Sequence, residues 1–111
     1  MSQARLATSI LVGGLVRKAE SEGGFAAVLA KGDPTAGAVL IVLVERGGDP
    51  RILERILQPD GRYVWQQTEL GNPADLRKFL DRRRGFDPDI WILELDVPSR
   101  ERFAAGMIDF D

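Results

Sequence analysis

A single apolar segment constrains the fold of this 111-residue chain more than any other feature. Seven consecutive apolar residues, Ala38 to Val44, lie between two stretches that are dense in turn-forming residues. The run is short and rich in β-branched side chains, which is typical of a strand that is buried on both faces. It is also far shorter than the roughly 20 residues that cross a bilayer. The sequence therefore predicts a sheet with this run at its centre.

Turn signals divide the rest of the sheet into short strands. Pro59-Asp60-Gly61 predicts a tight turn, because proline presets the bend and glycine accepts a positive φ. Residues 90–95 alternate so that Trp91, Leu93 and Leu95 share one face of a strand. The strands predicted from these patterns are 25–30, 38–44, 51–58, 62–68 and 90–95.

The first predicted helix spans residues 8–22. Leu11 and Leu15 belong to an apolar stripe with four-residue spacing, which is typical of an amphipathic helix. The Gly13-Gly14 pair disfavours a helix, since each glycine costs about 1 kcal/mol relative to alanine. An alternative therefore stays open, in which residues 6–12 form a strand and the glycines form a turn.

The second predicted helix spans residues 72–85. Asn72-Pro73 opens it, with a capping side chain followed by proline at the first helical position. Leu76, Phe79 and Leu80 are spaced as a stripe that faces the core. This stripe predicts that the helix packs on the sheet.

These elements together predict an α+β fold. Short connections favour antiparallel pairing, so we expect a two-layer sandwich with a mainly antiparallel sheet of about five strands and two helices on one face. Residues 99–107 are expected to add a short helix, whereas the pattern in 108–111 assigns no element. No repeat or long linker interrupts the chain, so residues 1–111 are expected to form a single domain.

The composition excludes several kinds of chemistry. The chain has no cysteine and no histidine, which rules out disulfides, thiolate nucleophiles and Ser-His-Asp catalysis. We therefore predict no catalytic residue, no metal site and no cofactor. The formal net charge of −2 counts against a dedicated nucleic-acid module. No signal peptide is recognisable, so a cytoplasmic protein without membrane contact is expected.

One candidate interaction site combines a loop with a corner of the chain. The loop 31–37 is dense in turn residues and predicts either a structured hairpin loop or a nest of backbone N–H groups that binds an anion. Asp87 and Asp89 flank a proline between helix and strand, where such side chains bond to the backbone of a turn. If the two segments meet, they form one surface site. Its residues are Lys31, Gly32, Asp33, Thr35, Asp87 and Asp89.

The second predicted helix is basic. Its positive side chains are Arg77, Lys78, Arg82, Arg83 and Arg84. The helix dipole favours cations near a helix C-terminus, and this explains much of the cluster. The alternative is contact with the phosphates of a nucleic acid, which Arg17 and Lys18 would extend if the two helices lay side by side. No stacking aromatic residue interleaves the arginines, which favours the structural explanation.

Two segments carry a resemblance to a known family. They are Gly24 to Val39 and Phe86 to Leu95, supported by Thr8-Ser9-Ile10 and Arg17-Lys18. Most of the chain is similar to short alphaproteobacterial proteins that are catalogued as domain of unknown function 1491. The resemblance implies a bacterial, non-secreted protein, and it carries no activity, substrate, cofactor or catalytic residue.

Three hypotheses for function follow. The first is a non-catalytic domain that binds another protein, or a second copy as a homodimer, through a sheet edge or the loop surface. The second is a nucleic-acid-associated protein that uses the basic helix, which requires a continuous basic surface. The third is a small-molecule or metal-dependent enzyme built on Asp33, Asp87 and Asp89 in a concave pocket. It ranks last, because the chain has no histidine and no standard motif.

Overall fold

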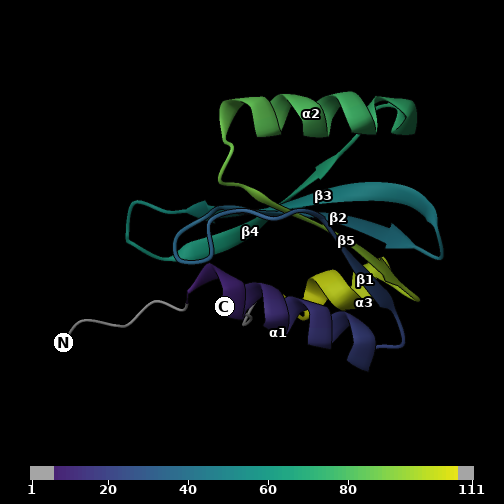
Figure 1. Cartoon of the computed structure of the whole chain (residues 1–111). Coiled ribbons are helices and arrows are strands. Elements are labelled where there is room, and N and C mark those ends of the chain that lie inside the picture. The colour runs from purple at the N-terminus through teal and green to yellow at the C-terminus, as the bar shows by residue number, and fades with distance from the viewer. Residues whose placement is uncertain (1–6, 108–111) are drawn as a thin grey trace.

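The computed structural model describes residues 7–107. Residues 108–111, to which the sequence pattern assigned no element, lie outside the described residues. The elements are α1 (Thr8–Ser21), β1 (Phe25–Ala30), β2 (Val39–Glu45), β3 (Gly48–Leu57), β4 (Tyr63–Glu69), a 3-10 turn η1 (Pro73–Asp75), α2 (Leu76–Phe86), β5 (Trp91–Val97) and α3 (Arg100–Ala105). The strands form one open sheet with helices above and below it (Figure 1). The predicted α+β class with a five-stranded sheet is therefore confirmed.

The strand order of the sheet is β1-β5-β2-β3-β4. β5 pairs antiparallel with β1 and parallel with β2, and the remaining pairs are antiparallel. The sheet is therefore mainly antiparallel, as predicted. The loop 31–37 is not a hairpin loop, because β5 lies between the two strands that the loop connects. Gly32 and Gly37 approach the carbonyl oxygen of Asp89 closely, so the segment that leads into β5 occupies the space between β1 and β2.

The two long helices lie on opposite faces of the sheet, and the prediction that both cover one face is wrong (Figure 1). α1 and α3 pack on the face that contains Ile41 and Leu93. α2 packs on the other face, which contains Leu40 and Ile92. The reason lies in β2, whose residues 39–44 are all buried and therefore need cover on both faces. The molecule has three layers, with the sheet in the middle.

α1 is an amphipathic helix, and the alternative strand is not formed in the described residues 8–12. Its stripe of Leu11, Leu15 and Ala19 is buried against the sheet, as the four-residue spacing predicts. Asn72 is a cap, as predicted, but it caps the 3-10 turn η1 that leads into the second helix: its side chain accepts a hydrogen bond from the Ala74 amide at 3.0 Å. The α-helix itself begins at Leu76, later than predicted. None of the described helices combines the length and the apolar composition that a bilayer crossing requires.

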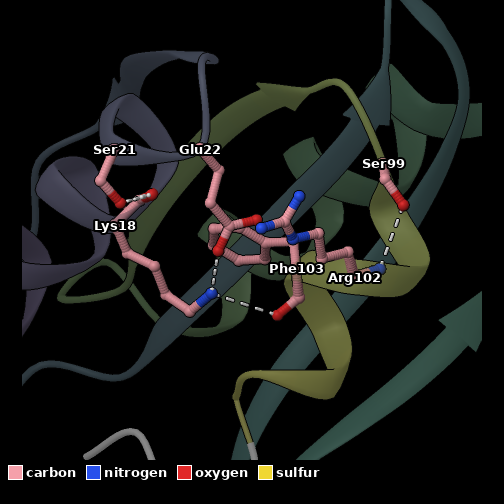
Figure 2. Close-up of polar contacts among 6 residues, drawn as sticks. All are labelled: Lys18, Ser21, Glu22, Ser99, Arg102 and Phe103. Carbon is pink, nitrogen blue, oxygen red and sulfur yellow. Dashed lines mark hydrogen bonds and ion pairs between the residues drawn. The ribbon is translucent and has the colours of Figure 1, made fainter.

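The predicted short helix near the C-terminus is α3, and it packs on the protein's own core. Phe103 and Met107 are buried with α1 and the sheet in one apolar cluster. Figure 2 shows the junction with α1, where the ammonium of Lys18 forms an ion pair with Glu22 and donates to the Phe103 carbonyl at 3.4 Å. The same ammonium lies 4.1 Å from the centroid of the Phe103 ring. The Ser99 hydroxyl caps α3 by accepting from the amide of its third residue (Figure 2).

Candidate functional site

The loop 31–37 meets the corner between α2 and β5. The Asp33 amide donates to the Asp89 carbonyl at 3.0 Å. The indole Nε1–H of Trp91 donates to the Asp33 carbonyl at 2.8 Å. A Cβ added at Gly32 would lie 2.1 Å from the Asp89 oxygen, so the two backbones are in direct contact. The two segments of the candidate interaction site are therefore locked together by their main chains.

The carboxylates at this junction stabilise its turns. Asp33 Oδ2 accepts hydrogen bonds from the amides of Thr35 at 3.2 Å and Ala36 at 2.7 Å. Asp87 Oδ1 accepts from the amide of Asp89 at 3.1 Å. In the part of the chain that the structure describes, no group of three or more potential ligands could hold a metal ion. This geometry favours a structural role for Asp33 and Asp87 over acid–base chemistry.

The same loop also accepts hydrogen bonds from the first turn of α1. The Thr8 amide donates to the Thr35 carbonyl at 3.1 Å, and the Ser9 amide donates to the Pro34 carbonyl at 2.9 Å. The Thr8 hydroxyl donates to the Gly37 carbonyl at 2.9 Å. The amides of Thr8 and Ser9 have no hydrogen-bond acceptor inside the helix, and no side chain caps this end of α1. The carbonyls of the loop therefore take the place of a cap. The six residues of the candidate interaction site thus lie together. Three of them are exposed, namely Lys31, Thr35 and Asp89, and three are half-buried, namely Gly32, Asp33 and Asp87.

The basic side chains of α2 point in three directions rather than forming one continuous patch. Arg77 and Arg84 line a groove on the β1 side of the helix. Lys78 and Arg82 line a hollow on the opposite flank. Arg83 turns toward the sheet. A single strand of phosphates along this helix would therefore meet only part of the cluster.

Arg83 ties α2 to the sheet. Its guanidinium forms an ion pair with Glu54 of β3 and lies 5.9 Å from the centroid of the Phe79 ring. Arg17 and Lys18 belong to α1, on the other face of the sheet, so they do not extend the basic surface of α2. The condition for that extension, that the two helices lie side by side, is not met, because the sheet separates them.

The edge strand β1 exposes three large apolar side chains. Phe25, Val28 and Leu29 are 76%, 51% and 45% exposed. The opposite edge strand, β4, has only one large exposed apolar side chain, Val64, and its last four residues are polar or charged. Sequence reasoning did not identify the β1 edge, because an apolar six-residue segment is equally typical of an inner strand.

A groove runs between β1 and α2, with a volume of about 320 Å³. Its apolar lining residues are Leu29, Leu76, Leu80 and Ile92. Arg77, Asp81 and Arg84 are exposed and line the same groove. Sequence reasoning missed this feature because the residues come from a strand, a helix and another strand that only the fold brings together.

Comparison with known proteins places the chain in a family. The family model described as "Protein of unknown function (DUF1491)" matches residues 6–105. The chain belongs to this family. A DUF1491 protein from Caulobacter crescentus has a crystal structure with a TM-score of 0.80 and 38% sequence identity, covering 89% of this chain and 94% of that one. The solution structure of a protein from A. tumefaciens is 26% identical with a TM-score of 0.75, and the match covers 90% and 92% of the two chains.

The DUF1491 match spans β1, the loop 31–37 and α2. The β1 edge and the groove therefore lie within the part of the chain that the family model describes. No curated protein matches the sequence. The family description assigns no function, so a functional proposal depends on the geometry of this DUF1491 chain.

Proposed function

We propose that this protein is a non-catalytic binding domain that pairs a strand of a partner protein with β1. The observation that carries the proposal is the exposure of three large apolar side chains on an edge strand: Phe25, Val28 and Leu29. Such edges invite pairing with another chain, and soluble proteins usually protect them with charges. β4 has that protection in its polar C-terminal half, whereas no residue of β1 is charged.

Strand addition fits the local geometry of β1. Phe25 to Val28 pair with β5 in an unbroken register, and the irregularity of the strand lies beyond them, before Ala30. A partner strand would gain main-chain hydrogen bonds from the outer edge and side-chain contacts on both faces. Full burial of one exposed large apolar side chain contributes about 1.5–3 kcal/mol, and the three side chains of β1 would each supply the part of this that their exposed area represents. The cytoplasm is the proposed location, on the sequence evidence alone.

The test places a photo-activated crosslinker in the edge strand in living host cells. The variant Phe25→p-benzoylphenylalanine keeps an aromatic side chain at a position that is 76% exposed. We expect a covalent adduct of defined mass after irradiation, which identifies the partner as another protein or as a second copy. The matched control carries the crosslinker at Val64 of the other edge strand, which is 45% exposed.

Addition of Val28→Lys to the crosslinking variant tests whether the adduct depends on the strand. The new charge opposes burial of the edge, so the adduct yield is expected to fall about tenfold or more, the effect of about 1.4 kcal/mol in binding. Equal adducts at positions 25 and 64, or an adduct that survives Val28→Lys, would contradict the proposal. Circular dichroism confirms that each variant is folded.

A further inference from the structure

The groove between β1 and α2 continues the proposed binding edge. Leu29 belongs to both features, because it is an exposed residue of β1 and also lines the groove. A strand paired with β1 alternates its side chains between the two faces of the sheet. Those that point toward α2 reach the groove, where Leu76, Leu80 and Ile92 supply an apolar lining.

The charged side chains that line the groove are mainly positive. Arg77 and Arg84 line it with a single carboxylate, Asp81, although the chain as a whole carries a formal charge of −2. Both arginines are exposed. Arginine presents a planar fork of donors that matches a carboxylate, and such charge-assisted hydrogen bonds are stronger than neutral ones. The groove thus combines an apolar lining with two guanidinium groups beside the free edge.

We propose that the segment that pairs with β1 is acidic, with an apolar side chain in the groove and a neighbouring carboxylate at Arg77 and Arg84. This inference rests on the proposed function and names its partner class. The occupant is a segment of a different protein. A second copy that paired through β1 would contribute the uncharged segment Phe25–Ala30, which carries no carboxylate for the two arginines.

The experiment selects ligands from a displayed library of random peptides of about 12 residues, using the full protein as the target. Enriched peptides are expected to alternate apolar residues with aspartate or glutamate. Their affinity is expected to fall about tenfold for Arg77→Gln/Arg84→Gln and less than about twofold for Lys78→Gln/Arg82→Gln. The second pair is a matched control, because it removes the same charge from the opposite flank of the same helix.

Two edge variants separate this inference from the proposed function. Phe25→Ala and Val28→Lys change exposed side chains of β1, and both are expected to weaken binding about tenfold or more. Peptides that require the edge but show no acidic bias, and bind the Arg77→Gln/Arg84→Gln protein normally, would overturn the acidic partner and leave strand addition intact. A dimer in sedimentation that Val28→Lys dissociates would likewise replace it with a second copy. Failure to select any peptide that requires β1 would overturn both proposals.

Discussion

Replacement of Gly32 by alanine is expected to destabilise the protein by about 2–4 kcal/mol, a large part of the stability of a small domain. The new Cβ would lie 2.1 Å from the carbonyl oxygen of Asp89 and 2.7 Å from the carbonyl carbon of Ile90. Both are main-chain atoms in the segment just before β5, so neither can rotate away. The loop must move, and it loses the hydrogen bonds that the Asp33 backbone makes to Asp89 and Trp91, each worth about 1 kcal/mol.

Urea denaturation measures this effect against a matched control. In Gly71→Ala the new Cβ meets nothing within 4 Å, and the backbone at Gly71 is not in the left-handed region. The free energy of unfolding is therefore expected to change by no more than about 0.5 kcal/mol. Equal stability of the two variants would contradict the close contact. A Gly32→Ala protein of normal stability that fails to bind the partner would instead show that the loop takes part in binding and is not only structural.

Replacement of Phe103 by alanine is expected to cost about 3–5 kcal/mol, the usual range for a buried phenylalanine. The ring is 0% exposed and lies in the cluster between α1 and the sheet. Its loss leaves a cavity and removes the contact with the Lys18 ammonium, which lies 4.1 Å from the ring centroid. A loss of this size would show that α3 is an integral part of the core.

The control for this variant is Phe86→Ala, which makes the same chemical change at a side chain that is 82% exposed. Its free energy of unfolding is expected to change by no more than about 0.5 kcal/mol. Thermal denaturation of both variants provides the comparison. If Phe103→Ala were as stable as Phe86→Ala, α3 would not pack on the core as described.

The secondary structure could be predicted from the sequence because its signals are local. The alternation in residues 90–95 assigns Trp91 and Leu93 to one face and Ile92 to the other, and the structure buries them in separate clusters. Asn72 was predicted as a cap from its position before proline, and its side chain accepts the hydrogen bond of a cap. Such patterns depend on neighbours along the chain, which the sequence displays.

The order of the strands could not be predicted in the same way. Successive strands usually pair, so β1 and β2 were expected to be neighbours, yet β5 lies between them. The layers also differ from the prediction, although the fully apolar run at 39–44 already required cover on both faces. Burial of a strand depends on which strands lie beside it, and for that reason Phe25 was not recognised as an exposed edge residue.

The candidate sites show the same limit. The sequence predicted that the loop at Asp33 and the corner at Asp89 could meet, and they do, through a main-chain hydrogen bond. The groove was missed, because Leu29 and Arg84 are far apart in the chain and only the fold of β1 and α2 brings them together. An amphipathic helix pattern indicates which side of α2 faces the sheet, but not which strand edge lies beside it.

Amide hydrogen exchange tests strand addition most directly. It is measured on the protein alone and on the protein saturated with the partner that is captured at Phe25. We expect slower exchange in the complex for the amides of Phe25–Leu29 that do not pair with β5, because a partner strand would accept their hydrogen bonds. The amides of β4, at the other edge of the sheet, are expected to exchange at the same rate with and without the partner. Protection of β4, or of the Lys78 and Arg82 flank of α2, with no change in β1 would contradict strand addition at β1.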